Sequence, residues 1–437
     1  MILHHDWIHT YAHKLDPRLR RLLREREQGA PPAAAALRRI AERHGRKPAF
    51  PAIICLHPDA RDQDCSELLE LAAAHGGIIH REFGLIGGFG ATLSLNAAKE
   101  LVGHDAVCRI AYDCEVHTLL DVASPAIGAP LAWEEGRSGR GITIAVVDTG
   151  VYPHSDFTEP RNRLLAFADL VDGRRRPYDD NGHGTHVAGC ALGNGAASEG
   201  KYRGPAFEAG LVAVKALDRT GAGRASDIIE AISWVVENRD RYGIRVLSLS
   251  IGAEAETSYR DDPLAQAAAR AWDAGIVVCA AAGNAGPDPR TISTPGIEPK
   301  VITVGAIDDR GTVERSDDVL APYSSRGPTP DGLNKPELLA PGSAITAPRA
   351  RGSVLDAELP AGRPNYLTLS GTSMATPLVA GLAALILEAE PSLSPADVKR
   401  RLMRTAERWR DGGSGQGAGY VRFSATRRRR SDSREGS

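Results

Sequence analysis

The sequence of 437 residues contains little cysteine, and its six cysteines do not form the close Cys/His pairs of a structural zinc site. Two of the six lie inside apolar stretches, where a buried free thiol is the ordinary state. Extracellular proteins that depend on disulfide bonds use cysteine more heavily than this. We therefore expect a reduced, cytoplasmic protein.

Net charge and long apolar runs are also lacking. The chain has 53 Lys and Arg against 55 Asp and Glu, a formal net charge of -2, so charge gives no argument for nucleic acid or membrane as partner. The first residues do not form a positively charged segment followed by a long apolar core. No apolar run reaches the roughly 18–20 residues of a membrane-spanning helix. We expect no signal peptide, no membrane partner and no nucleic acid, while release by a non-classical route stays open.

The composition changes several times along the chain. Residues 1–50 are rich in Arg and Ala, with helical periodicity around Leu19 and Leu23, and predict a basic helical segment. Residues 51–119 follow the order strand, helix, strand, strand, helix, strand, which predicts a small α+β ferredoxin-like unit. Residues 426–437 have nothing apolar to bury and predict a disordered basic tail.

The larger part of the chain alternates predicted strands and helices. Residues 120–140, punctuated by Pro and Gly, predict a linker and the entry to the next domain. Residues 141–425 predict a parallel α/β domain, whose ligands gather beyond the carboxyl ends of its strands. Strands are expected at Ile142–Val147, Leu211–Ala216, Ile244–Ser250, Ile276–Ala281 and Val301–Ala306, and helices at His183–Ala191, Ser226–Asn238, Leu264–Ala274, Met374–Glu390 and Pro395–Thr405.

Polar residues follow two of the predicted strands. Asp148 ends the buried run Ile144-Ala145-Val146-Val147, and is either a turn residue or a functional group at the ligand edge. Asn284 follows the strand that ends at Ala281. Its amide could donate to a developing oxyanion, although asparagine is also common in turns.

Glycines flank His183 in the run Asn181-Gly182-His183-Gly184-Thr185-His186, so the backbone can pass closely and leave the imidazole at a helix start. A His-x-x-His pair could suggest zinc, but no carboxylate or third histidine follows at the usual spacing. We therefore expect His186 to be a packed residue. The run Asp179-Asp180-Asn181 is compatible with an ion site or with a solvated loop.

Ser373 lies in Gly371-Thr372-Ser373-Met374-Ala375-Thr376-Pro377, directly before an apolar run that predicts a buried helix. The free N–H groups and the positive dipole end of a helix start favour nearby negative charge, which suits a nucleophile whose reaction builds an oxyanion. A serine that merely caps the helix would explain these residues as well.

Together the four motifs resemble those of the subtilisin-like serine proteases, and the AprX-type bacterial subtilases are the most similar group. The resemblance covers about residues 130 to 425 and rests on motifs in the order Asp148, His183, Asn284 and Ser373. It implies a subtilisin-like parallel-sheet domain with helices on both faces and the activity of a serine endopeptidase. Ser373 would be the nucleophile and His183 the base, with Asp148 orienting His183 and Asn284 holding the oxyanion.

The resemblance also implies where the substrate binds. The residue before the cut would lie between two strand ends, with Ser293 near the pocket floor, and the lining residues would be Ser250, Ile251, Gly252, Ala281, Ala282, Gly283 and Ser293. Ala253 stands where many relatives have a second glycine. No acidic cluster is evident here, so we expect apolar side chains before the cut rather than basic ones.

The resemblance further implies that residues 51–119 are an inhibitory pro-domain that assists folding, with processing near residues 117–120. The chain would be a monomer that acts on proteins or peptides and is inhibited by its own pro-domain. Structural Ca²⁺ is common in the family, and Asp156 aligns with a family ligand. A hypothesis of a different class is a catalytically silent binding or chaperone-like module that keeps the fold, but all four catalytic positions are filled.

Overall fold

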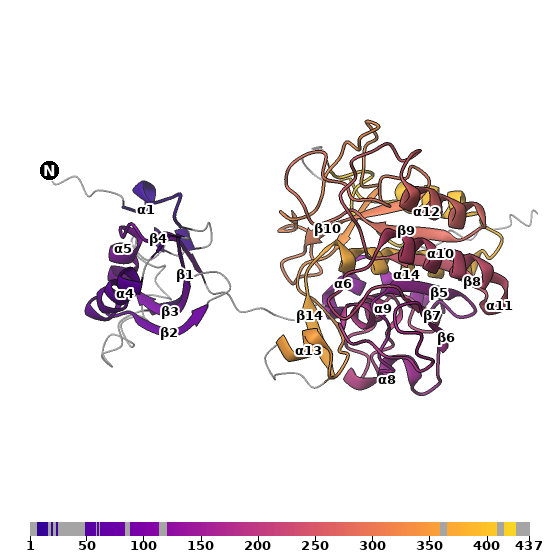
Figure 1. Ribbon diagram of the computed structural model, residues 1–437, viewed down its shortest axis with the longest axis horizontal. Helices are drawn as coiled ribbons and strands as arrows, with labels where there is room; N and C mark the ends of the chain where they lie inside the picture. Colours follow the sequence, from indigo (N-terminus) through magenta and orange to yellow (C-terminus); the bar gives the residue numbers. More distant parts are fainter. Residues whose placement is uncertain are drawn as a thin grey trace, which may run out of the picture. The chain divides into compact units, whose positions relative to one another are not determined.

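The structure is a computed structural model, and it describes residues 7–15, 19–20, 23–24, 49–57, 59–60, 62–83, 88–112, 120–358, 365–408 and 415–424. The chain divides into two compact units, Met1–Val116 and His117–Ser437 (Figure 1). Cys114, residues 117–119 of the predicted processing point and the predicted tail at residues 426–437 lie outside the described residues.

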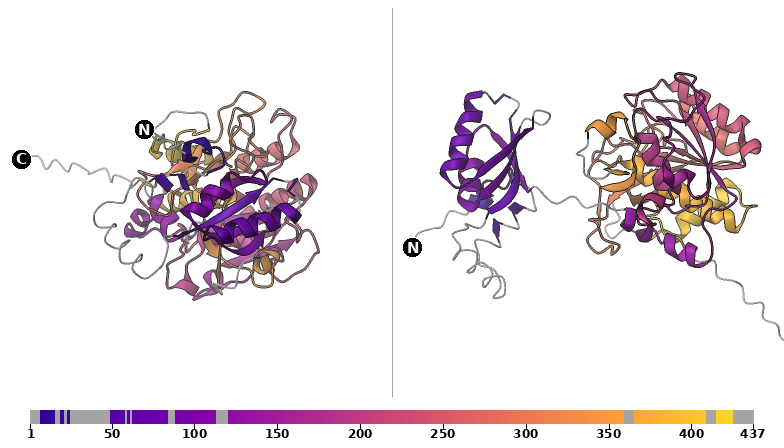
Figure 2. Two further views of the ribbon diagram at one scale, coloured as in Figure 1. Left: turned by 90° about the vertical axis from the view of Figure 1, so that its left-hand side faces the viewer. Right: turned by 90° about the horizontal axis from the view of Figure 1, so that it is seen from below.

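The first unit contains a four-stranded antiparallel sheet in the order β2-β3-β1-β4. Helices α4 and α5 cover one face of this sheet (Figure 2). Ser94 caps α5, because its hydroxyl accepts a hydrogen bond from the N–H of Ala97 at 3.0 Å. The order of elements matches the predicted one: β1 (Ala49–Leu56), α4 (Asp62–Ala74), β2 (Ile78–Phe83), β3 (Gly88–Ser94), α5 (Leu95–Val102) and β4 (Val107–Tyr112).

The start of the chain belongs to this unit as well. Helix α1 (Trp7–Thr10) precedes a bridge in which Leu15 pairs with Ile110 of β4, and the N–H of Ile110 donates to the carbonyl oxygen of Lys14 at 2.7 Å. The core of the unit includes the buried side chains of Trp7, Ile8, Leu15, Leu19 and Leu23. The predicted boundary at residue 50 is therefore not a boundary between compact units, because the small sheet fills its core with these apolar side chains.

The second unit is built on an eight-stranded sheet in the order β11-β10-β9-β8-β5-β7-β6, with β12 beside β10. Its strands are parallel except β11, which runs antiparallel to β10. The prediction of a parallel α/β domain is confirmed. The strands are β5 (Thr143–Asp148), β6 (Leu164–Asp169), β7 (Gly210–Lys215), β8 (Ile244–Leu249), β9 (Val277–Ala281), β10 (Ile302–Asp308), β11 (Val319–Leu320) and β12 (Leu338–Pro341).

Helices cover both faces of this sheet (Figures 1 and 2). Helices α9 and α14 pack against each other and against the sheet, and α10 packs against α12. The predicted helices are all present, with ends within two residues of the predicted ones. The helices are α6 (Leu120–Ala126), α7 (Ala129–Glu134), α8 (Ser155–Thr158), α9 (His183–Leu192), α10 (Ala225–Glu237), α11 (Arg239–Tyr242), α12 (Pro263–Asp273), α13 (Val354–Glu358), α14 (Thr372–Ala389) and α15 (Pro395–Thr405), with one 3-10 turn at Ala196–Ser198.

Helix α14 runs through the core of the second unit. It is 18 residues long and, by length and composition alone, apolar enough to cross a membrane, but 83% of that window is buried inside the protein. A helix that is apolar all round is expected in the core of a large domain. Its first turn, which carries Ser373, is thereby held rigidly by the core.

The predicted linker at residues 120–140 differs from the structure. It contains α6 and α7, and Ala123, Ile127 and Ala132 are fully buried in the core of the second unit. Gly128 lies between the two helices with a φ of 77°, a conformation that favours glycine. Gly128 therefore marks the start of α7, Pro125 lies inside α6, and the segment is not an extended linker.

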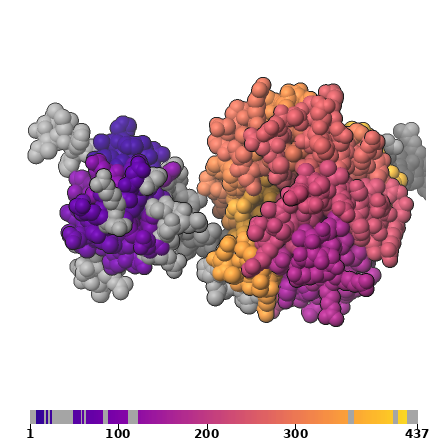
Figure 3. Space-filling view, viewed as in Figure 1, coloured from indigo at the N-terminus to yellow at the C-terminus, as the bar shows by residue number. Residues whose placement is uncertain are grey.

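Several short strands were not predicted. Strand β6 lies at the end of the sheet, and most of its residues are only half-buried, so it lacks the continuous apolar run of a central strand. Strands β13 (Ile345–Pro348) and β14 (Tyr366–Leu369) form a separate antiparallel pair. Strand β13 packs against α9 and is buried. Figure 3 shows the surface of the unit, with orange and magenta parts of the chain side by side.

Among the described cysteines, Cys55, Cys108, Cys190 and Cys279 are free thiols, as predicted. Cys190 and Cys279 are buried, while Cys55, Cys65 and Cys108 are half-buried. Burial raises the pKa of the Cys190 and Cys279 thiols well above the ordinary value. Both thiols are therefore protonated and unreactive at neutral pH.

Candidate active site

Asp148 and His183 form a close pair at the carboxyl edge of the central sheet. Asp148 is the last residue of β5, and His183 is the first residue of α9. Nδ1 of His183 lies 2.7 Å from Oδ1 of Asp148. The carboxylate is buried, while 24% of the His183 side chain is exposed. The carboxylate is thus shielded from water, and the imidazole reaches a surface where a ligand can meet it.

Two glycines bring α9 close to the end of β5. Gly182 precedes the helix with a φ of 106°, which glycine adopts without steric cost. A Cβ on Gly184 would lie 2.3 Å from the carbonyl oxygen of Gly150 and 3.1 Å from Cβ of Asp148. Only glycine permits this approach. The glycines on either side of His183 therefore let the backbone pass closely, as the sequence predicted.

The pKa values of the two histidines of α9 are shifted in opposite directions. Burial disfavours the charged form of His183, but the carboxylates of Asp148 and Asp179 outweigh it and raise its pKa above the ordinary value. His186 is fully buried with Nε2 3.0 Å from the carbonyl oxygen of Ile345, and burial together with nearby His183 lowers its pKa to about 3. His186 is therefore a neutral packed residue, as predicted. The described residues contain no group of three or more His, Cys, Asp or Glu that could hold a metal ion.

The oxygen-rich run that enters α9 is buried at its first residue. Oδ1 of Asp179 accepts hydrogen bonds from the hydroxyl of Thr149 at 2.9 Å and the N–H of Gly182 at 2.7 Å. Its Oδ2 accepts from the N–H of Thr185 at 2.8 Å and from the hydroxyl of the same residue at 2.6 Å. The carboxylate thus joins the end of β5 to the first turn of α9. No pattern in the sequence distinguishes such a buried carboxylate from a solvated one.

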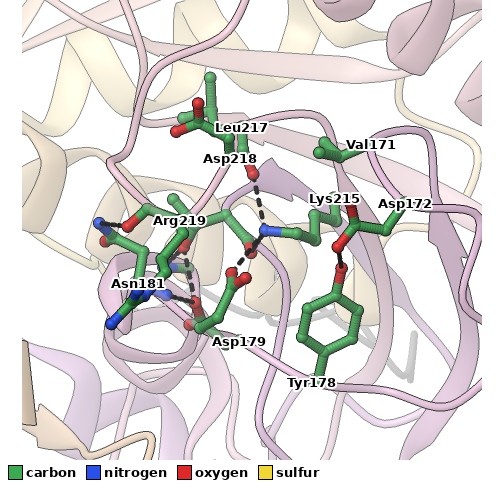
Figure 4. A network of polar contacts seen from close by, with 12 residues as sticks. Val171, Asp172, Tyr178, Asp179, Asn181, Lys215, Leu217, Asp218 and Arg219 are labelled. Atoms are coloured by element: carbon green, nitrogen blue, oxygen red, sulfur yellow. Dashed lines mark hydrogen bonds and ion pairs between the residues drawn. The ribbon is translucent and has the colours of Figure 1, made fainter. Parts of the chain in front are cut away.

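A buried lysine that the sequence analysis did not single out lies behind the Asp148–His183 pair. Lys215 is the last residue of β7 and pairs in register with Asp148. Its side chain is fully buried, and its Nζ lies 2.8 Å from Oδ1 of Asp180. Figure 4 shows Lys215 near Tyr178, Asp179 and Leu217. The signal that could have found it is a lysine at the end of an otherwise apolar buried strand.

Ser373 lies in the first turn of α14 and is not its capping residue, because Gly371 occupies the N-cap position. The Ser373 hydroxyl donates to the carbonyl oxygen of Ser250 at 3.1 Å, and the Ser250 hydroxyl donates to the carbonyl oxygen of Ser373 at 2.9 Å. Ser250 and His183 line the same cavity. In this rotamer the Ser373 hydroxyl makes no hydrogen bond to His183 in the part of the chain described; such contacts often form only with substrate bound.

Asn284 faces the start of α14. Its Oδ1 accepts hydrogen bonds from the N–H of Thr372 at 2.9 Å and from the Thr372 hydroxyl at 3.0 Å. A Cβ added to Gly371 would lie 3.4 Å from Nδ2 of Asn284 and 3.7 Å from the backbone nitrogen of Ser373. These two nitrogen atoms therefore border one small space beside Ser373, an arrangement that suits a developing oxyanion.

The residues predicted to bind substrate lie around Ser293. A Cβ on Gly252 would lie 2.8 Å from Cβ of Ser293, and a Cβ on Gly283 would lie 2.1 Å from its Oγ. Ala253 pairs with Thr294 through backbone hydrogen bonds of 3.1 and 2.9 Å. The structure thus brings the predicted segments together at the ends of β8 and β9.

A cavity of about 520 Å³ opens beside His183. This volume lies within the range of about 300–1,000 Å³ that is usual for ligand pockets. The end of β8 lines the cavity together with apolar side chains, which include Ile251, Leu217, Ile228 and Leu264. The cavity therefore suits an extended peptide with apolar side chains.

Asp156, the predicted calcium ligand, accepts hydrogen bonds from the protein itself. Its carboxylate is fully buried, and Oδ1 accepts hydrogen bonds from the hydroxyl of Tyr366 at 2.8 Å and the N–H of Ala197 at 3.1 Å. Oδ2 accepts from the N–H of Gly195 at 3.2 Å. A calcium ion at this carboxylate would have to share its two oxygens with these donors. A metal at Asp156 therefore stays a prediction.

Replacing Tyr366 by phenylalanine should lower the free energy of unfolding by about 1–3 kcal/mol, because the buried carboxylate of Asp156 loses a donor. Thermal unfolding in EDTA and in calcium chloride should give the same loss. The control Tyr242→Phe removes a hydroxyl that has no hydrogen-bond partner among the described residues, and should change stability by less than about 0.5 kcal/mol. Calcium that stabilised the wild type but not Tyr366→Phe would instead indicate a metal beside Asp156.

Residues 139–423 match the family model described as the subtilase family. The chain is 48% identical to the serine protease AprX of Bacillus subtilis (strain 168) over 306 residues, which are 68% of this chain and 69% of that protein. It is 33% identical to subtilisin E of the same organism over 345 residues, 77% of this chain and 80% of that protein.

Solved structures of similar fold agree with these relatives. A structure titled S41 psychrophilic protease has a TM-score of 0.56 and 33% identity, and the match covers 66% of this chain and 93% of that one. A structure titled sphericase has a TM-score of 0.54 and 32% identity, with the same coverage of 66% and 93%. The similarity therefore extends over nearly the whole of each solved chain.

Proposed function

This chain belongs to the subtilase family and is a subtilisin-like serine endopeptidase, and on that premise we propose that it cuts peptide bonds through an acyl-enzyme formed on Ser373. The observation that carries the proposal is the 2.7 Å contact of a partly exposed imidazole with a buried carboxylate, His183 with Asp148. His183 lines the same cavity as Ser250, and the carbonyl oxygen of Ser250 accepts a hydrogen bond from the Ser373 hydroxyl.

In the proposed reaction Oγ of Ser373 attacks the scissile carbonyl carbon while Nε2 of His183 takes its proton. The tetrahedral oxyanion receives hydrogen bonds from Nδ2 of Asn284 and the N–H of Ser373. His183 then passes the proton to the leaving amine, and water hydrolyses the ester by the same steps. Asp148 accepts the Nδ1–H, keeps His183 in the correct tautomer and stabilises the imidazolium.

A further part of the proposal is that the chain is made as a zymogen. The first compact unit ends at Val116 and the second begins at His117, so a cut near this point would release one unit intact. The first unit would then act as the intramolecular inhibitor and folding aid. The described residues of that unit hold none of the residues proposed for catalysis, so its removal would leave the proposed site complete.

Subtilases are generally known to bind structural calcium, and we propose no ligand set for it in this chain. A calcium ion at Asp156 would have to share its carboxylate with the donors described above. A calcium ion elsewhere would stabilise the fold and take no part in the proposed chemistry. No step of the proposed mechanism depends on it.

A serine-directed phosphonofluoridate tests the proposed role of Ser373. Mass spectrometry of the processed protein should place one label on Ser373, because Asp148 and His183 activate only this hydroxyl. The variant His183→Ala should be folded and label far more slowly. A folded wild type that hydrolyses no protein and carries no label would favour the alternative of a catalytically silent binding or chaperone-like module.

A further inference from the structure

The ammonium group of Lys215 is fixed by three acceptors. Its Nζ donates to the carbonyl oxygen of Thr149, the carbonyl oxygen of Leu217 and Oδ1 of Asp180, each at 2.8 Å. Figure 4 shows the contact between Lys215 and Leu217. An ammonium has three N–H donors, so all are used. The Lys215 side chain is 0% exposed, whereas 27% of the Asp180 side chain is exposed. The lysine therefore has one arrangement in the fold and holds its three partners in place.

Each partner belongs to a different part of the proposed active site. Thr149 directly follows Asp148 in the chain. Asp180 lies in the segment that enters α9, the helix that begins with the proposed base, and Leu217 lines the cavity beside it. Lys215 thus connects three parts of the proposed site: the end of the strand that carries Asp148, the segment that leads to His183, and the cavity lining at Leu217.

The surroundings of Lys215 show that it does not act on the substrate directly. Its Nζ is buried beneath the strand ends and is not part of the cavity lining. The ring of Tyr178 covers it, with its centroid 5.2 Å from Nζ. The carbonyl oxygen of Tyr178 in turn accepts the N–H of Val151 at 3.0 Å, just after Thr149 and Gly150. Any effect of Lys215 on turnover must therefore pass through the backbone that it holds.

We propose that Lys215 is a positioning residue that sets the distance and orientation between Asp148 and His183. The inference rests on the proposed serine protease function. Removing the ammonium leaves two buried carbonyl oxygens without their donor and Asp180 without its partner, so the segments on either side of the pair can shift. A shift of about 1 Å in a catalytic group can lower turnover by about 100-fold.

The test compares Lys215→Met with wild type in the full chain, using kcat per active site. Titration with a phosphonofluoridate counts the active sites, so loss of folded protein does not enter the rate. We expect kcat per titrated site to fall about 10- to 100-fold with KM within about threefold, because the cleft still binds peptide but the pair is misplaced. Lys215→Arg keeps the charge and donors and should stay at least fivefold above Lys215→Met.

Lys399→Met is a matched control. Lys399 is also largely buried, and its Nζ donates to the carbonyl oxygens of Pro299 and Val301 at 2.8 and 2.9 Å and to Oε1 of Glu337 at 2.8 Å. These contacts are the same in kind as those of Lys215 but hold none of the proposed catalytic residues. This variant should lose stability and keep kcat per titrated site within about twofold.

Asp180→Asn keeps the inference testable if Lys215→Met does not fold. It changes a partly exposed partner without emptying the core, and should lower kcat per titrated site about three- to tenfold. A folded Lys215→Met chain that stays unprocessed while Lys399→Met matures would support the inference equally. The inference would be overturned if the folded Lys215→Met chain had the wild-type kcat per titrated site. If Lys215→Met does not fold, a wild-type kcat per titrated site in Asp180→Asn would overturn it. An equal loss of kcat per titrated site in Lys399→Met would overturn it as well. A wild type without activity or label would instead overturn the proposed function.

Discussion

Replacing Ser373 by alanine should lower kcat for peptide hydrolysis by about a million-fold, because the acid, base and nucleophile act as a unit. The remaining rate comes from the oxyanion donors and from binding, which the alanine leaves in place. Helix α14 should be unaffected, because its N-cap is Gly371 and not Ser373. Hydrolysis of an unfolded protein by purified chains measures the loss.

The same variant tests the zymogen. If Ser373 cuts its own chain, wild type purified from cells should begin near residue 117, and Ser373→Ala should keep its original N-terminus in mass spectra. Ser233→Ala is the matched control, since Ser233 is exposed on α10 and its hydroxyl bonds only to the carbonyl oxygen of Ile229. Processing of Ser373→Ala in a host without related proteases would show that another enzyme makes the cut.

Replacing Asp148 by asparagine should lower kcat by about ten-thousand-fold. The NH2 group of the amide can donate to Nδ1 of His183 and favour the wrong tautomer, and the neutral amide cannot stabilise the imidazolium as a carboxylate does. The fold should persist, because the side chain keeps its size at the end of β5. Asp308→Asn changes the last residue of β10, whose carboxylate contacts Arg310, and should stay within about threefold of wild type.

The pH dependence of Asp148→Asn should change in a defined direction. The Asp148 carboxylate raises the pKa of His183, so the wild-type base stays protonated, and inactive, to a higher pH than an ordinary histidine would. Without that carboxylate the pKa falls, and the acid limb of kcat/KM should move to lower pH. A limb that stays in place or moves to higher pH would contradict the assignment of His183 as the base.

The central part of the fold could be predicted because its strands are buried on both faces. Strands such as β5 and β9 are continuous apolar runs, and the helices between them have clear starts and ends. Strand β6 at the sheet edge has no such run, and β13 pairs with β14, which begins at Tyr366. Their pairing depends on tertiary contacts that no local pattern records.

In the candidate site too, some residues could be predicted from local sequence features and others could not. Asp148 and His183 follow from a carboxylate at a strand end and an imidazole between glycines, which are local features. The role of Asp179 and Lys215 depends on what surrounds them after folding. The metal at Asp156 was predicted from alignment alone, whereas the hydroxyl that occupies its oxygen comes from Tyr366, 210 residues later in the chain.

The buried residues at the start of the chain limit how the first unit can be exchanged among relatives. Burial of each large apolar side chain contributes about 1.5–3 kcal/mol, and the net free energy of unfolding of a domain is only about 5–15 kcal/mol. A unit transplanted from Ala49 onward would leave behind Trp7, Ile8, Leu15, Leu19 and Leu23. A hybrid protease should therefore contain the complete first unit of one parent, from Met1 to Val116.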